Sequence, residues 1–201
     1  MKKLLSVLLI CGLMAASAAS CAGKADDTAA DVPVIQEMTT EEVTTEDPAV
    51  FDKKAEDVAK RYMKAVVDDH SALTAAKIMF PEAIALKSFT TEETARKELF
   101  DGKEMDNGVK TGSFRTDKCE PLTESQLRNA EGYYEKYARV ISGLPEMDCT
   151  VTDGREITFT VALKVGRDSR DYTATYVVVD MGDEGCKLIN TDASQLYGLA
   201  D

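Results

Sequence analysis

The sequence predicts an α+β domain in which helices come first and an antiparallel sheet follows. Apolar residues recur about every 3.6 positions over residues 51–66 and again over residues 127–141, which is typical of amphipathic helices. From residue 146 onward they alternate with polar residues, which is typical of strands with one buried face. Helices that are segregated from antiparallel strands indicate the α+β class.

The N-terminus has the layout of a secretory signal peptide. Two lysines precede an apolar run over residues 4–14, which is too short for the ~20 residues that span a bilayer. The segment Ala18-Ala19-Ser20-Cys21 resembles the lipobox of bacterial lipoproteins, although that family usually has Leu where Ala18 stands. The resemblance implies that Cys21 is acylated and anchors the mature chain to the membrane. Ordinary signal cleavage after Ala19 or Ser20 is the alternative.

An acidic stretch follows the cysteine. Residues 22–49 contain one base, Lys24, and eight acids, with no apolar periodicity. Such a segment cannot bury enough apolar surface to offset its ordering entropy. The sequence therefore predicts a signal peptide over 1–20, a disordered acidic tether over 21–49 and a single domain over 50–201.

The charge balance excludes one class of partner. The chain has 24 basic and 36 acidic residues and a formal net charge of −12 at pH 7. Nucleic-acid binding needs clustered Lys and Arg, so no nucleic-acid partner is expected.

The helices have clear start and stop signals. Asp47-Pro48 caps a helix that ends near residues 68–70, and Ser71 caps a second helix that Pro81 stops. Thr90 and Glu93 predict a capping box for a third helix, with Gly102 at its end. A further helix begins with a capping box over residues 123–126 and ends before residues 143–145.

The strands are predicted over residues 113–120, 146–152, 155–165, 171–181 and 186–192. Asp153-Gly154 is a hairpin signal between the second and third of these segments. Ile157, Phe159, Val161, Leu163 and Val165 are expected to point inward. A turn is expected within residues 166–170, and a four-residue loop there is expected to set Val165 opposite Tyr172 and Val161 opposite Tyr176.

Three stretches resemble cystatin-like domains of bacterial lipoproteins, a group related to the nuclear-transport-factor-two-like and lumazine-binding-like superfamily. They are "AEDVAKRYMKAVVDDHSALTAAKIMFPE", "LTESQLRNAEGYYEKY" and "GCKLINTD". The resemblance implies a curved antiparallel sheet around a long helix, with a cone-shaped pocket between them. Cys186 stands where that group usually has an aromatic residue. Function does not transfer with a fold of this kind.

The tyrosines are the candidate pocket residues. Aromatic side chains at helical and strand spacing fill a core more often than they line a ligand pocket, and both interpretations stay open here. The residues in question are Tyr62, Tyr133, Tyr134, Tyr137, Tyr172 and Tyr176.

His70 is the candidate for catalysis. It is the single histidine of the chain. Enzymes of the superfamily often use a His–Asp pair inside the cone, so the resemblance implies an acid–base role for His70 with Asp68. The alternative is a solvated cap at a helix C-terminus, where the helix dipole favours a cation, with Asp68 and Asp69 as surface carboxylates.

No metal or cofactor site is expected. Cys119, Cys149 and Cys186 lie 30 and 37 residues apart, which matches no zinc-binding pattern. One disulfide with one thiol, or three thiols, both remain open. The acidic residues 180–185 lack the spaced ligands of a calcium loop and predict a turn. The chain has no nucleophile elbow, P-loop, zinc-protease or dinucleotide-binding motif.

These observations favour a lipid-anchored, extracytoplasmic domain that is not an enzyme and that binds a small ligand or an envelope protein. The alternatives are a small isomerase-like or hydrolase-like enzyme that uses His70, and a structural envelope scaffold.

The lipobox resemblance makes a direct prediction. Cys21→Ser removes the thiol to which acyl chains would be attached, so we expect it to abolish labelling by radioactive palmitate and to release the protein from the membrane fraction. Cys11→Ser is the matched control, because Cys11 lies in the segment that is cleaved off, and it should label like the unmodified chain. Undiminished labelling of Cys21→Ser would contradict the anchor.

Overall fold

A four-stranded antiparallel sheet in the order β1-β2-β3-β4 forms the framework of the computed structural model, which describes residues 48–103 and 108–200. The α+β class is confirmed. The strands are β1 (Val109–Pro121), β2 (Asp153–Val165), β3 (Asp168–Asp180) and β4 (Cys186–Ile189). The helices are α1 (Pro48–Met63), α2 (Ala72–Met79), α3 (Glu82–Ser88), α4 (Glu92–Phe100), α5 (Glu124–Lys136) and α6 (Leu196–Ala200). α1 and α5 continue into the π-helical turns η1 (Lys64–Asp68) and η2 (Tyr137–Ile141), and η3 (Gly182–Glu184) is a 3-10 turn.

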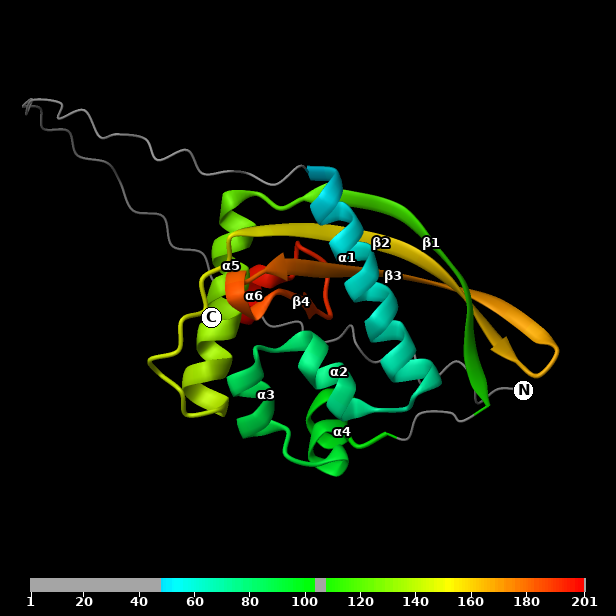
Figure 1. Ribbon diagram of the computed structural model, residues 1–201, viewed down its shortest axis with the longest axis horizontal. Helices are drawn as coiled ribbons and strands as arrows, with labels where there is room; N and C mark the ends of the chain where they lie inside the picture. Colours follow the sequence, from blue (N-terminus) through cyan, green and yellow to red (C-terminus); the bar gives the residue numbers. More distant parts are fainter. Residues whose placement is uncertain (1–47, 104–107, 201) are drawn as a thin grey trace, which may run out of the picture.

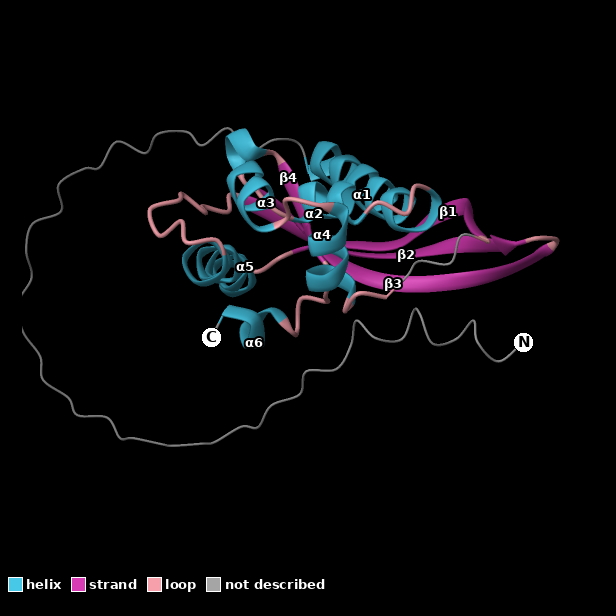
Figure 2. Cartoon of the chain, turned by 90° about the horizontal axis from the view of Figure 1, so that it is seen from below, coloured by secondary structure: helices cyan, strands magenta, loops and turns pink. Residues whose placement is uncertain are grey.

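The long helix α1 lies diagonally across the strands (Figure 1). Figure 2 shows α1, α2 and α3 on one side of the bent sheet and α6 on the opposite side, while the far ends of β2 and β3 project beyond the helices. The C-terminal segment is held to the sheet by the Ala193 N–H, which donates to the Glu156 carboxylate at 2.7 Å.

The core lies between α1 and the inner face of the sheet. The predicted helical stripe is buried, with Phe51 and Tyr62 at 1% and 3% exposed. The inward positions of β2 face it as predicted, with Ile157 and Phe159 both 0% exposed. Complete burial of each such side chain stabilises the fold by about 1.5–3 kcal/mol. Val165, at the tip of the hairpin, is half-buried.

The predicted hairpin at Asp153-Gly154 is wrong. Residues 146–152 form no strand, and Asp153 is the first residue of β2. A Cβ on Gly154 would lie 2.7 Å from Leu122 Cδ1, so the glycine permits close packing of the chain that leads into α5. The Leu122 N–H also donates to the Gly154 carbonyl at 3.0 Å.

The predicted register of β2 on β3 is also wrong. Val165 pairs with Asp168 and Val161 pairs with Tyr172. Gly166 has φ 61° and the next residue has a negative φ, which is the pattern of a two-residue type II′ hairpin turn. The polar residues 168–170 therefore extend the strand, whereas a longer loop was expected.

The N-terminus of α2 has two caps, one local and one tertiary. The Ser71 hydroxyl accepts from the Thr74 N–H at 3.1 Å, as the sequence predicts. Glu92 on α4 accepts from the Ala72 N–H and, at 3.2 Å, from the Leu73 N–H. A carboxylate is favoured there because the first N–H groups of a helix have no partner within it.

The capping box of α4 lies one residue later than predicted. Thr91 and Thr94 form it, in place of Thr90 and Glu93. This shift places Glu92 in the first turn of α4, beside the start of α2. The helix ends at Phe100, near Gly102 as expected, and Asp101 follows it in the left-handed conformation at φ 53°.

The tertiary cap can be tested by mutation. Glu92→Ala leaves the Ala72 and Leu73 N–H groups without their carboxylate, so we expect the free energy of unfolding in urea to fall by about 1–3 kcal/mol. Glu93→Ala, the exposed neighbour, should change it by less than about 0.5 kcal/mol. Equal effects of the two substitutions would show that the cap contributes nothing.

Candidate functional site

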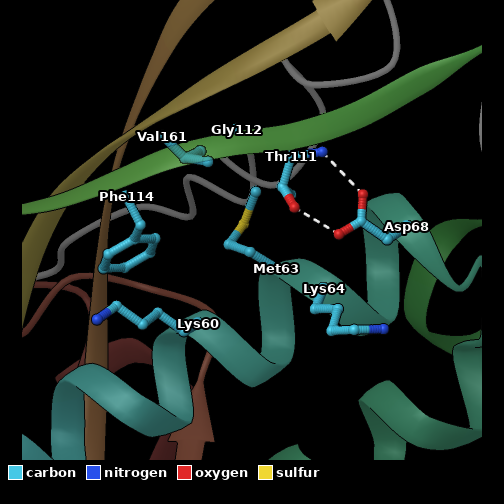
Figure 3. Close-up of a pocket in the computed structure, with 8 residues that line it drawn as sticks. All are labelled: Lys60, Met63, Lys64, Asp68, Thr111, Gly112, Phe114 and Val161. Carbon is cyan, nitrogen blue, oxygen red and sulfur yellow. Dashed lines mark hydrogen bonds between the residues drawn. The ribbon is translucent and has the colours of Figure 1, made fainter.

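An open pocket of about 240 Å³ lies where α1 and η1 meet the edge strand β1 (Figure 3). We refer to it as the α1–β1 pocket. It is lined by Lys60, Met63, Lys64, Asp68, Thr111, Gly112, Phe114 and Val161.

The floor of the pocket is apolar and its rim is basic. Met63 and Val161 are 3% and 1% exposed, and the ring of Phe114 stacks on that of Phe159 with centroids 4.6 Å apart. Lys60 and Lys64 lie one helical turn apart beside this floor. The Lys60 ammonium is 5.3 Å from the Phe114 ring centroid, a cation–π distance that holds the lysine over the pocket.

Asp68 ties one end of the pocket to the start of β1. Its carboxylate accepts from the Thr111 N–H at 2.8 Å and from the Thr111 hydroxyl (Figure 3). The Lys110 ammonium donates to the Asp68 carbonyl at 2.9 Å. Burial acts to raise the pKa of Asp68, but the two Thr111 hydrogen bonds and the nearby Lys110 and Lys64 outweigh it and lower the pKa. Asp68 is thus an ionised acceptor in a structural contact.

His70 ends a helix and is not part of the pocket wall. It has φ 50°, in the left-handed region that rarely suits residues other than glycine. Its ring is half-buried, and its Nδ1 is buried without a hydrogen-bond partner among the described residues. Among the described residues the Asp68 carboxylate accepts from Thr111, and the buried Nδ1 of His70 does not donate to it.

The end of η2 repeats the end of η1. The Asp69 N–H donates to the Lys64 carbonyl at 3.0 Å, and the Ser142 N–H donates to the Tyr137 carbonyl at 3.0 Å. In both cases a second hydrogen bond spans six residues. The Ser71 N–H donates to the Ala65 carbonyl at 2.9 Å, and the Leu144 N–H donates to the Ala138 carbonyl at 2.7 Å. Gly143, at φ 64°, occupies the position after η2 that His70 occupies after η1. His70 therefore occupies a position that favours glycine.

Five of the six predicted pocket tyrosines, all but Tyr172, lie in two aromatic clusters. Tyr62 and Tyr176 meet edge to face at 5.4 Å between α1 and β3, and Tyr172 is half-buried farther along β3. Tyr134 is 0% exposed and its hydroxyl donates to the Met79 carbonyl at 3.0 Å; burial raises its pKa well above the usual value. Tyr133 and Tyr137 pack around Phe80, with Tyr137 at 4.4 Å. The structure places none of the six in the wall of the α1–β1 pocket.

The three cysteines of the domain are free thiols. Burial, with Asp52 beside the first and Glu135 beside the second, raises the pKa of both Cys119 and Cys149 to about 11. At neutral pH these two side chains are therefore poor nucleophiles. Cys186 lines a second depression of about 350 Å³ on the other flank of α1, together with acidic and basic side chains that include Lys54 and Arg61.

The described residues contain neither a cluster of metal-binding side chains nor a membrane-spanning helix. Within residues 48–103 and 108–200, no three or more His, Cys, Asp or Glu side chains gather in a way that could hold a metal ion. No helix in this part of the chain is long and apolar enough to cross a membrane. Comparisons with protein-family models, curated proteins and solved structures gave no match to the chain.

The lining of the α1–β1 pocket was not predicted from the sequence. Lys60 and Lys64 look like ordinary residues of a solvated helical face, and β1 was expected to begin only at residue 113, beyond Thr111. The sole signal was Met63, an apolar residue between two lysines at helical spacing. The pocket exists because β1 runs beside α1, a contact between segments about 50 residues apart.

The position of His70 predicts an unusual response to glycine. His70→Gly removes the left-handed strain and the unpaired Nδ1, so we expect the free energy of unfolding to rise by about 0.5–1 kcal/mol. Asp69→Gly is the matched control, because Asp69 is right-handed at φ −92°, and it should lower stability by about 1 kcal/mol. Urea unfolding measures both, and a loss of stability in His70→Gly as large as that in Asp69→Gly would contradict this account.

Proposed function

We propose that the protein is a lipid-anchored, extracytoplasmic binding domain without catalytic activity, and that it holds a partner protein at the α1–β1 pocket. The observation that carries the proposal is an open pocket of about 240 Å³ with an apolar floor and two lysines in its lining. The anchor rests on the resemblance around Cys21, which lies outside the described residues.

The size and openness of the pocket favour a protein partner over a small ligand. Sites for small molecules usually have volumes of about 300–1,000 Å³ and enclose most of the ligand surface. The α1–β1 pocket is smaller and opens to solvent, so it suits one inserted side chain of a larger molecule. The remainder of such a partner would contact the rim and the exposed face of α1.

The chemistry of the pocket supports binding without catalysis. General acid–base catalysis needs a titratable group within hydrogen-bonding reach of the substrate. The titratable groups of the pocket wall are engaged in contacts within the protein: Asp68 accepts two hydrogen bonds from Thr111, and Lys60 and Lys64 pair with Glu56 and Asp69. His70 and the high-pKa thiols of Cys119 and Cys149 lie outside the pocket wall.

A second surface supports the scaffold alternative. Leu86 on α3 and Val140 and Ile141 on η2 are 61%, 63% and 57% exposed. The ends of these two elements are joined by a hydrogen bond of 2.7 Å between the Ser88 and Ser142 hydroxyls. Exposed apolar side chains on neighbouring elements are available for contact with another protein.

Site-specific photo-crosslinking in cells that express the protein separates the two surfaces. We expect a benzophenone side chain at Ser113, an exposed position beside the pocket, to give a discrete protein adduct. Lys64→Trp should block the pocket and reduce that adduct at least fivefold, whereas Lys77→Trp on α2 should leave it unchanged. An adduct at position 140 with none at position 113 would instead favour the scaffold surface.

A further inference from the structure

The charge of the domain is unevenly distributed. α1, η1 and β1 together carry eight basic and six acidic side chains, whereas the rest of residues 50–201 carries 13 basic and 22 acidic ones. These three elements, the basic side of the molecule, therefore carry a small net positive charge on an otherwise acidic body, and within them Lys60 and Lys64 border the α1–β1 pocket whereas Lys54 and Arg61 border the second depression. An acidic partner is repelled from most of the surface and attracted to this side.

Most carboxylates on the basic side are already bound within the protein. Asp52 accepts from Arg155 at 2.7 Å, and Glu56 accepts from Lys60 and from the Thr116 hydroxyl. Asp68 is held by Thr111, and Asp117 accepts from Thr160 at 2.6 Å and from Arg115 at 2.7 Å. The carboxylates close to the lysines of the pocket rim are thus mainly ones that hydrogen bonds within the protein hold in place.

The ion pairs of the two rim lysines are weak enough to be replaced. Lys60 pairs with Glu56 and Lys64 with Asp69, but the lysine side chains are 41% and 61% exposed. Exposed pairs of this kind contribute about 0–1 kcal/mol. A partner carboxylate at the edge of an apolar contact would be better shielded from water and would compete with them.

The edge of β1 does not favour addition of a further strand. Its pairing with β2 is interrupted between Thr111 and Phe114 and again between Thr116 and Lys118. The Thr111 N–H is occupied by Asp68. Bulges and charged residues on an edge strand oppose main-chain pairing with another chain. Recognition at this edge therefore depends on side chains.

We propose that the α1–β1 pocket binds an acidic polypeptide segment of a partner, with one apolar side chain against Met63, Phe114 and Val161 and carboxylates on Lys60 and Lys64. This inference rests on the proposed function and specifies the chemistry of the partner. Charge supplies orientation and association rate, and the inserted side chain supplies most of the contact area.

The test uses the full-length chain in mild detergent and a fluorescein-labelled peptide with glutamates around a single phenylalanine. Fluorescence anisotropy should show binding that weakens when NaCl is raised from about 50 to about 300 mM. Peptides with Gln for Glu, or with Ala for Phe, should bind at least tenfold more weakly.

Charge reversal in the protein supplies the matched comparison. Lys60→Glu with Lys64→Glu should weaken binding of the acidic peptide at least tenfold. Lys77→Glu with Lys97→Glu changes the net charge equally at exposed positions away from the pocket and should weaken it less than twofold. Thermal unfolding followed by circular dichroism confirms that both double variants are folded.

Three outcomes would overturn the inference. They are equal binding of the Gln peptide, equal losses in the two double variants, and at least tenfold tighter binding after residues 22–47 are replaced by a Gly/Ser linker. The last would identify the acidic segment of the chain itself as the occupant. A pocket-dependent adduct at position 113 without acidic-peptide binding would refute the partner chemistry and leave the proposed function standing.

Discussion

The packing of α1 into the inner face of the sheet is the constraint on which the rest of the structure depends. Arg155, 5% exposed, fixes the start of α1: its guanidinium donates to Asp52 and to Asp153, both at 2.7 Å, and lies 4.8 Å from the centroid of the Phe51 ring. The C-terminal half of α1 is held to β3 by the contact between the rings of Tyr62 and Tyr176. A buried cation is tolerated inside a fold when its hydrogen bonds are satisfied. Here the Arg155 guanidinium also fixes where the start of α1 lies along β2.

The position of α1 also explains where the surface is hollow. The apolar stripe of the helix fills the inner side of the sheet with aromatic and aliphatic side chains, so the tyrosines become core residues. Depressions remain on the two flanks of α1, because a straight helix cannot stay in contact with a twisted sheet along its whole width. Side chains of α1 border both depressions. The candidate site is thus a consequence of how the core is closed.

Helix ends account for the residues that first suggested chemistry. His70 and Gly143 occupy equivalent left-handed positions after π-helical turns, and Asp68 bonds to Thr111 across to β1. A histidine close to aspartates in sequence resembles a catalytic pair, but here Asp68 accepts from Thr111 and the Nδ1 of His70 has no partner among the described residues. Glu92 shows the converse, since a side chain of ordinary appearance caps a helix 20 residues earlier in the chain.

The sequence by itself determined the α+β class, the starts of α1, α2 and α5, and the inward face of β2 at Ile157 and Phe159. These features depend on capping residues and on periodicity, which act over a few neighbouring positions. The tertiary structure alone decided the register of β2 on β3, the role of Gly154 and the α1–β1 pocket. Each of these depends on contacts between distant segments, such as the approach of Leu122 to Gly154 and of Lys60 to Phe114, and no local pattern encodes such a contact.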